Sequence, residues 1–215
     1  HSTFSNLNLK TGKSAILANG AQNGNDSFYI DVSFSDVFMQ DLLFFQDEQW
    51  EGVVNGFFNI RQSSLGFGGN SSLRFSDLVL NNIPLGEADV KLESRDDSQD
   101  YQLALSFAEE GDEVFTANGS IGLEGDKPIW DINTVFNDYN LSLIAGLTHE
   151  TFAPFSGRAN GTIRLTSSEG LLSPKGELFV DDMVMGVPYL NTLYSFPETV
   201  PFRFDDETIN IPLTT

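Results

Sequence analysis

Apolar and polar residues alternate strictly along the segment from Gly157 to Leu165, G-R-A-N-G-T-I-R-L. Alternate residues of a β-strand point to the same side of the sheet, so one side of this segment carries only small or apolar groups and the other is polar. The same period-2 pattern marks residues 28–34, 52–60, 101–107 and 114–123. It predicts a succession of half-buried strands, and therefore an all-β protein.

The alternating segments also repeat. Residues 117–123 match 159–165 at an offset of 42, and residues 52–60 match 157–165 at an offset of 105. A second phrase, F-S-D-L-V-L-N-N-I-P at 75–84, matches 179–188 at an offset of 104. We interpret this as a degenerate internal repeat, about 28–107 and 129–213, whose units share one core. No linker divides the chain, so residues 1–215 are expected to form a single all-β unit.

Three Asn-Gly dipeptides, at 55, 118 and 160, lie inside alternating segments rather than between them. Asn-Gly usually marks a hairpin turn. Here the alternation continues through the dipeptide and the glycine falls on the apolar side, which indicates a bend or a close approach of the backbone. We expect Gly119 and Gly161 to face inward at mid-strand in a strongly curved sheet, where a side chain would crowd the interior.

Two short segments change to helical spacing. From Ser35 to Phe45 the apolar residues Phe38, Leu42 and Phe45 follow this period, and Ser35 and Asp36 are candidate caps. After Asn140, four residues have similar spacing: Leu141, Ile144, Ala145 and Thr148. Residues 1–27 are rich in Asn, Gly and Ser, and we expect one short strand, Ala15–Ala18, among turns. The acidic clusters Asp96–Asp100 and Glu109–Glu113 are expected at hairpin tips.

Twelve large apolar residues share the phase of the alternating lines. They are Phe28, Ile30, Val32, Phe34, Phe58, Ile60, Leu103, Leu105, Ile121, Leu123, Ile163 and Leu165. A shift of strand register by one residue would turn all these side chains to solvent. Because the same alternation is maintained from segment to segment, we interpret these residues as one shared apolar face.

Composition excludes several classes of function. The net charge of −20 argues against binding to nucleic acid and against docking on an anionic membrane surface. The chain has no cysteine, hence no disulfide and no thiolate site. Phe is far commoner than Tyr or Trp, at 19 against 5 and 2, which suits either a dry core or a surface that meets acyl chains. No apolar run reaches the ~18 residues of a membrane helix.

Catalytic motifs are not evident either. Gly-Lys-Ser at 12–14 lacks the earlier glycine of a phosphate loop, and no G-x-S-x-G occurs. His149 stands alone as a possible base. The acid pairs Asp181-Asp182 and Asp205-Asp206 are neighbours in expected strands, so their side chains should point to opposite faces. We expect no enzyme activity, no cofactor and no metal.

Several phrases resemble the TamB translocation and assembly module family, in the form found in Bacteroidota. They are G-R-A-N-G-T-I-R-L, S-P-K-G-E-L-F-V, M-G-V-P-Y-L-N-T-L-Y-S-F, V-P-F-R-F and T-I-N-I-P-L, together with F-S-D-L-V-L-N-N-I-P-L-G-E-A-D-V. The most specific is V-P-Y-L-N-T-L-Y, and the resemblance covers roughly residues 28 to 213. It implies a β-taco, which is an elongated, strongly curved open sheet forming a trough with an apolar interior and one or two short helices.

The resemblance also implies a function without catalysis. Members of this family are anchored in the inner membrane, span the periplasm of Gram-negative bacteria and meet a BamA-like or TamA-like outer-membrane barrel. They are implicated in outer-membrane protein assembly and in phospholipid transport along the groove, and they resemble AsmA-like and bridge-like lipid-transfer proteins. The twelve apolar residues would then line the groove and contact acyl chains. His1-Ser2 and the ending I-P-L-T-T suggest a fragment whose membrane anchor lies elsewhere.

Two other functions fit the pattern. A closed β-sandwich from a secreted adhesin or glycan-binding protein would bury the apolar line completely. A chaperone-like trough would instead pair its edge with an unfolded outer-membrane strand.

Overall fold

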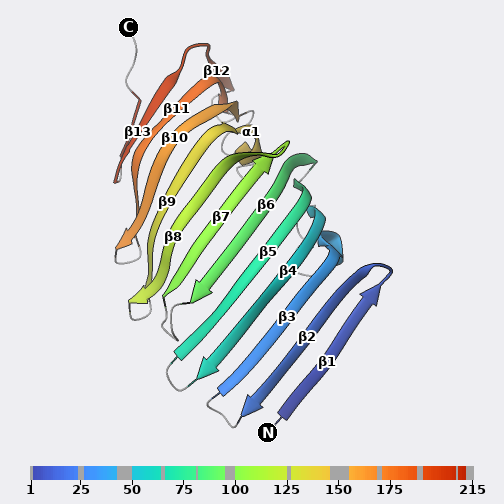
Figure 1. Cartoon of the computed structure of the whole chain (residues 1–215). Helices are drawn as coiled ribbons and strands as arrows, with labels where there is room; N and C mark the ends of the chain where they lie inside the picture. The colour runs from blue at the N-terminus through green and yellow to red at the C-terminus, as the bar shows by residue number, and fades with distance from the viewer. Residues whose placement is uncertain are drawn as a thin grey trace.

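The computed structural model describes residues 2–23, 27–42, 50–63, 66–80, 82–94, 100–124, 127–145, 155–168, 171–187, 191–206 and 208–211. These residues form one antiparallel sheet of 14 strands. Its order follows the chain from β1 to β11 and continues to β13 and β14, while β12 pairs with the far end of β11 (Figure 1). The sheet runs from an edge at β1 to an edge at β14 and does not close on itself. The expected all-β, curved and open sheet is confirmed.

The strands of the N-terminal half are β1 (Ser2–Thr11), β2 (Ser14–Asn23), β3 (Ser27–Phe38), β4 (Trp50–Ser63), β5 (Gly66–Leu80), β6 (Ile83–Ser94) and β7 (Tyr101–Glu109). Those of the C-terminal half are β8 (Asp112–Glu124), β9 (Lys127–Asn140), β10 (Phe155–Ser168), β11 (Leu171–Val187), β12 (Thr192–Phe196), β13 (Val200–Asp205) and β14 (Thr208–Asn210). A 3-10 turn, η1 (Met39–Asp41), follows β3, and a one-turn helix, α1 (Ser142–Ala145), follows β9.

One row of paired residues crosses the main path of the sheet. Directly opposite residues of antiparallel strands share a face, so the row defines an inner side. In strand order it runs through Leu9, Ile16, Phe34, Gly56, Leu73, Val90, Leu105, Ala117, Thr134, Ile163, Gly176, Phe204 and Ile209. Thr134 is the single polar member. The apolar phase that the sequence indicates segment by segment is therefore continuous from β1 to β14.

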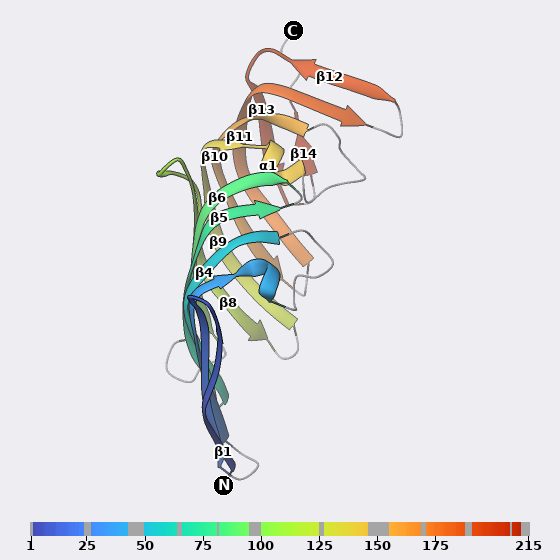
Figure 2. The same ribbon diagram turned by 90° about the vertical axis from the view of Figure 1, so that its right-hand side faces the viewer.

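The sheet bends along a line that we call the crease. Four aspartates there have left-handed backbone, with φ of 50° at Asp36, 52° at Asp77, 53° at Asp138 and 50° at Asp182. The pairing register shifts beside each of them, as at a β-bulge. A bulge bends its strand, and aspartate tolerates the left-handed conformation better than most residues. Figure 2 shows the strand ends beyond the crease curving to one side, so that the sheet forms a trough.

Strand β7 ends at the crease and strand β8 begins there. Their hairpin turns at Glu110 and Gly111, whereas β3 to β6 and β9 to β11 cross the bend and β12 lies beyond it. The curved flap is thus interrupted by a notch at β7–β8. Helix α1 lies on the concave side of the sheet and contacts both β10 and β6 across this notch (Figure 2).

Two clusters of buried side chains lie at the crease. One cluster contains Val37, Met39, Val54, Leu78 and Ala88, from β3, η1, β4, β5 and β6. A second cluster contains Leu141, Ala159, Val180 and Met183, from β9 to β11. Most of the inner face away from these clusters is only half-buried. The molecule therefore has two compact cores joined by a partly open apolar surface.

The same local order occurs around both clusters. A bulged strand, a short helical turn, a glycine-containing strand and a second bulged strand follow one another in β3–η1–β4–β5 and in β9–α1–β10–β11. Structurally equivalent residues lie 105 positions apart, as in Gly56 and Gly161. Asp77 corresponds to Asp182 and not, as the offset of 104 implied, to Asp181, because Asp182 is the bulged residue.

The helix expected from Ser35 to Phe45 is wrong over its first part. Strand β3 extends to Phe38 and only Met39–Asp41 form a 3-10 turn; residues 43–45 lie outside the described ranges. The bulge at Asp36 is the cause. It adds one residue after the inward-facing Phe34, so that Val37 is buried and Phe38, the first residue of the expected helical stripe, stays in the strand and is exposed. The second helix forms as α1, where Ser142 N donates to Asn140 Oδ1 at 3.1 Å.

Other strands are longer than the sequence pattern predicts. Residues 1–27, expected to be mostly turns, form the long hairpin of β1 and β2 as far as they are described. The segment Leu171–Val187 is one strand that continues through the bulge at Asp182, and Thr192–Phe196 form the separate strand β12. The Glu109–Glu113 cluster does lie at a hairpin tip, whereas residues 96–99 of the Asp96–Asp100 cluster lie outside the described ranges.

Gly161 and Gly119 lie at mid-strand on the inner side, opposite Leu178 and Leu103 respectively. The reason differs from the one expected. A Cβ on Gly161 would lie 2.2 Å from the carbonyl oxygen of Glu177, and one on Gly119 would lie 2.0 Å from that of Asp131. The neighbouring strand's backbone, and not the trough interior, excludes a side chain. These glycines allow strands to approach closely within the coiled sheet.

Candidate functional site

The twelve predicted groove positions all lie in strands and all fall on the inner side of the sheet. Residues 28, 30, 32 and 34 belong to β3, 58 and 60 to β4, 103 and 105 to β7, 121 and 123 to β8, and 163 and 165 to β10. Cross-strand pairs such as Ile30–Ile60 and Val32–Phe58 link them directly, and the inner row links the rest. Their contact with lipid stays a prediction.

These positions are not closed off like a core. Ile60 is 39% exposed, and most of the others whose side chains are described are half-buried. Ile163 is the exception at 8% exposed. A half-buried apolar face of this extent is a surface on which a further apolar partner can lie, because its transfer from water is favourable.

An apolar cleft lies along the crease, and we call it the crease cleft. Its volume is about 480 Å³. The inner face supplies its floor, and η1, α1 and the strand ends beyond the bend supply its roof. The lining residues are Met39, Trp50, Phe75, Leu78, Leu80, Leu85, Ala88, Val90, Leu105, Phe107, Phe115, Phe136, Tyr139 and Leu143. Its size lies within the roughly 300–1,000 Å³ of small-molecule sites.

Packed aromatic rings form one wall of the crease cleft. The ring centroids of Phe107 and Phe115 are 5.9 Å apart, those of Phe115 and Phe136 5.0 Å, and those of Phe136 and Tyr139 5.7 Å. Centroid separations of this size favour edge-to-face and tilted arrangements, which hold rings in place. This wall offers a rigid hydrocarbon surface with a single hydroxyl, that of Tyr139.

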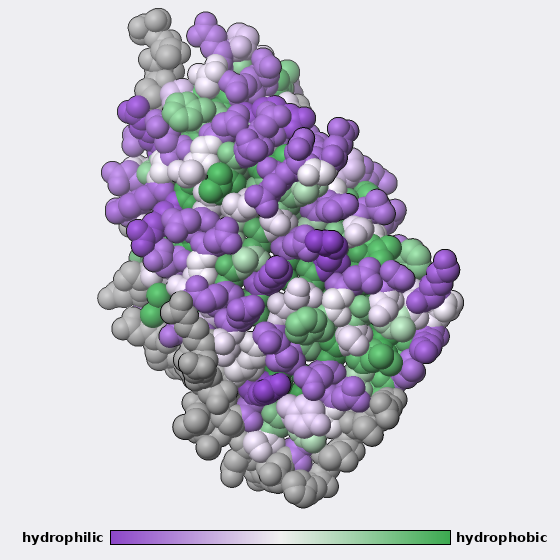
Figure 3. All heavy atoms as spheres, viewed as in Figure 1, coloured by the Kyte–Doolittle hydropathy of each residue, from purple (hydrophilic) through white to green (hydrophobic). Residues whose placement is uncertain are grey.

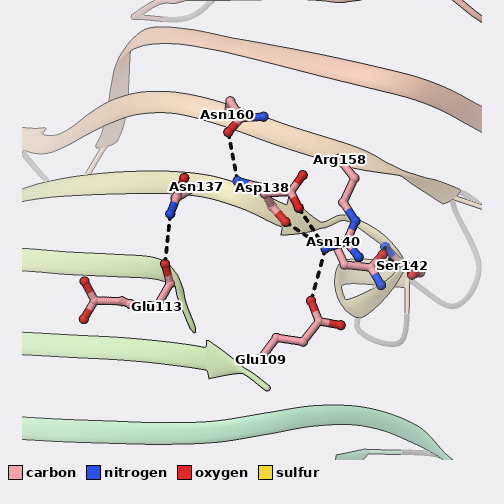
Figure 4. A network of polar contacts seen from close by, with 8 residues as sticks. All are labelled: Glu109, Glu113, Asn137, Asp138, Asn140, Ser142, Arg158 and Asn160. Carbon is pink, nitrogen blue, oxygen red and sulfur yellow. Dashed lines mark hydrogen bonds and ion pairs between the residues drawn. The ribbon is translucent and has the colours of Figure 1, made fainter. Parts of the chain in front are cut away.

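A polar rim lies at the notch, around Arg158 (Figure 4). Arg158 Nη1 lies 3.1 Å from Glu109 Oε2 and donates to the carbonyl oxygen of Asp138 at 2.9 Å. Burial, with a further contribution from the charge of Glu109, raises the pKa of Tyr139 above its usual value. The Tyr139 hydroxyl therefore stays neutral beside an anionic rim.

The buried polar side-chain atoms of the inner face are hydrogen-bonded. Thr134 is buried, and its hydroxyl donates to the carbonyl oxygen of Ile163 at 2.8 Å. In the part of the chain that is described, no buried side-chain nitrogen or oxygen lacks a hydrogen-bond partner. A trough floor with satisfied polar groups can hold hydrocarbon without leaving a buried donor or acceptor unpaired, which would cost free energy.

The outer face is polar and carries most of the ion pairs. Arg74 and Arg164 each make two hydrogen bonds to one carboxylate, that of Asp89 and that of Asp131, at 2.8–3.0 Å. The hydrogen bond from Arg164 lowers the pKa of Asp131. Figure 3 shows this side, facing away from α1, as mainly hydrophilic with separate apolar patches. The two sides of the sheet thus differ in chemistry.

The acid pairs singled out in the sequence have structural roles: one residue forms a bulge, and others bond to neighbouring side chains. Asp182 is the bulged residue of β11, and Asp181 accepts a hydrogen bond from the hydroxyl of Thr199 at 2.5 Å. Asp206 pairs with Lys175 at 3.1 Å. Within the described ranges no three His, Asp or Glu side chains are close enough to bind a metal ion. No helix there is long and apolar enough to span a membrane. His149 lies outside those ranges.

Of the residues that line the crease cleft, only Leu105 is among the twelve predicted positions. Phe107 and Phe115 could have been included, because they continue the alternating lines of Leu105 and Ala117. Trp50, Leu80 and Leu143 do not continue any of the alternating apolar lines recognised in the sequence. They reach the cleft only because the sheet folds over at the crease.

Comparisons of the chain with family models, with curated proteins and with solved structures found no match.

Proposed function

We propose that this chain is a non-enzymatic segment of a periplasm-spanning protein of Gram-negative envelope biogenesis. Its apolar trough would conduct phospholipid acyl chains between the inner and outer membranes, or support the assembly of outer-membrane proteins. A TamB-like protein of this kind would be anchored in the inner membrane outside these residues and would meet a BamA-like or TamA-like barrel. The resemblance of residues 28 to 213 to the TamB family suggests this setting.

The observation that carries the proposal is the continuous inner row from Leu9 to Ile209, with one polar member. An acyl chain in transit needs uninterrupted apolar surface, because each unpaired polar group along its path costs free energy. The half-buried state of this face leaves room for a partner, and the crease cleft gives it depth. The charged outer face keeps such an open sheet soluble.

Photocrosslinking in the periplasm of a Gram-negative host tests the proposal. Photoreactive amino acids are placed at Ile60 and Leu105 on the inner side, and at Arg61 and Ser106, their neighbours on the outer side. Ile163, another inner-side position, is less suitable for a photoreactive residue because it is almost fully buried. We expect lipid adducts at Ile60 and Leu105 only. Equal labelling of both sides, or none on the inner side, would contradict an apolar conduit.

The structure bears differently on the closed β-sandwich and on the chaperone-like trough. The described strands form one open sheet, so the closed β-sandwich of an adhesin is not the fold of this chain. A chaperone-like role keeps one supporting observation. Within the described ranges β1 pairs with β2 alone, so its outer edge offers backbone groups to an added strand. A crosslinker at Lys10 that captures outer-membrane protein in place of lipid would favour this second function.

A further inference from the structure

The crease cleft crosses the sheet from β4 to β9. Trp50 lies in β4 and Tyr139 in β9, and every strand between them contributes lining residues. These neighbouring strands are about 4.8 Å apart, so the cleft extends over about 24 Å. Its volume of about 480 Å³ is about sixteen times the ~30 Å³ that a water molecule occupies in the liquid. A methylene group is of similar size, so the cleft has room for one long hydrocarbon chain and not for two.

Ala88 is the smallest residue of the lining, and it lies within a row of aromatic side chains. Strand pairing places it directly between Phe75 and Phe107, and the row continues through Phe115 and Phe136. All five residues line the cleft. Because directly opposite residues share a face of the sheet, large rings flank the Ala88 methyl group on both sides. Ala88 therefore gives the cleft its depth at this point, and a larger side chain there would fill it.

The chemistry of the lining favours a hydrocarbon chain over a protein segment. Among the lining side chains only Tyr139 and Trp50 carry an O–H or N–H group. The backbone of the floor, from β5 to β8, is already paired across the sheet. An unfolded strand in the cleft would leave its own N–H and C=O groups without partners, and each such group costs free energy. A hydrocarbon chain has no such groups.

We infer that the crease cleft holds one unbranched hydrocarbon chain at a time, and that Ala88 makes the room for it. The inference rests on the proposed function and deepens it. It selects lipid over an outer-membrane protein strand as the occupant of this site, and one chain over two. The second chain of a diacyl lipid then lies outside the cleft, on the half-buried inner face.

Tryptophan fluorescence can test the selection of a straight chain. Trp50 lines the cleft and Trp130 does not, so the Trp130→Phe variant leaves a single reporter. The probes are n-dodecyl maltoside and the maltoside of 6-dodecanol, in which the same carbon atoms form two short arms. Both are titrated below their micelle concentrations. We expect the straight chain to bind at least roughly tenfold more tightly, because each methylene group kept out of the cleft forgoes about fourfold in affinity.

A matched pair of variants tests the role of Ala88. In Ala88→Leu the affinity for n-dodecyl maltoside should fall at least roughly tenfold, since the added carbons occupy space that the ligand needs. Ala104→Leu makes the same change on the outer side of β7 and should leave the affinity within roughly twofold. Circular dichroism and thermal melting establish that each variant is folded. If Ala88→Leu does not fold, the comparison of the two maltosides in the unaltered cleft decides alone.

The possible outcomes separate this inference from the proposed function. Equal binding of the two maltosides, or full affinity in a folded Ala88→Leu, would overturn the inference while leaving hydrocarbon binding intact. Displacement of n-dodecyl maltoside by a synthetic peptide with the sequence of an outer-membrane β-strand would overturn the choice of lipid. If neither maltoside changes Trp50 fluorescence and calorimetry detects no binding, the proposed conduit fails as well.

Discussion

The backbone N–H of Asp36 donates a hydrogen bond of 2.8 Å to the side-chain oxygen of Asn55 on the neighbouring strand. The N–H of Asp138 makes the same bond, at 2.9 Å, to Asn160. A left-handed residue in a bulge loses its regular ladder partner, and here the Asn of an Asn-Gly dipeptide replaces that partner. The dipeptide that elsewhere makes hairpin turns thus stabilises the crease.

Replacing this asparagine should weaken the protein. We expect Asn160→Ala to lower the free energy of unfolding by about 0.5–1.5 kcal/mol, since the Asp138 N–H loses its acceptor. Urea denaturation followed by circular dichroism measures the change. Asn118→Ala is the matched control, because Asn118 precedes a mid-strand glycine but accepts no bulge N–H within the described ranges; its effect should stay within about 0.5 kcal/mol. Equal losses in the two variants would contradict this role.

The mid-strand glycines should not tolerate even a methyl group. Gly119→Ala places Cβ 2.0 Å from the carbonyl oxygen of Asp131, so the strands must separate. We expect a loss of about 1–3 kcal/mol, as for other overpacked sites. Gly111→Ala is the control, because no atom lies within 4 Å of its added Cβ, although its φ of +92° makes the substitution strained. If Gly119→Ala changes the free energy of unfolding by less than about 0.5 kcal/mol, close strand approach does not exclude a side chain there.

Helix α1 should contribute to stability through one side chain. Leu143 is 6% exposed and lines the crease cleft. Leu143→Ala should lower the free energy of unfolding by about 2–5 kcal/mol, the usual cost of truncating a buried leucine. Leu193→Ala, at a position 62% exposed in β12, should change it by less than about 0.5 kcal/mol. A small effect of Leu143→Ala in thermal or urea unfolding would mean that α1 is not packed over the notch.

The outer-face ion pairs predict a pH effect of defined sign. Arg164 lowers the pKa of Asp131 by hydrogen bonding to it. A carboxyl group whose pKa is lower in the folded state stabilises that state above its unfolded pKa of about 3.9, and the contribution disappears as pH falls through the folded value. Carboxyl carbon NMR should show the pKa of Asp131 rising in Arg164→Gln. No rise would mean that the pair does not form in solution.

Strand positions and the shared apolar face could be predicted from alternation alone. Residues 28–34, 101–107 and 157–165 each keep one phase within an unbroken stretch of strand, so the period-2 pattern survives intact. The crease could not be predicted in this way. At Asp36 the extra residue moves the inner phase to Val37 and turns Phe38 outward, which alternation before the bulge does not foretell. Cleft residues beyond a bulge, such as Trp50 or Leu143, reach the cleft because the sheet bends at the crease. The spacing of apolar residues in the sequence does not predict this bend.

Because each long strand bends at the crease, the depth and the length of the trough are set by different features of the chain. Its depth is set by the number of residues on either side of the bulge, and its length by the number of strands. The equivalent units begin at β3 and β9, six strands apart, which at a strand spacing of about 4.8 Å corresponds to about 29 Å of trough. Tandem duplication of such a unit would extend the trough by that distance while leaving its cross-section unchanged.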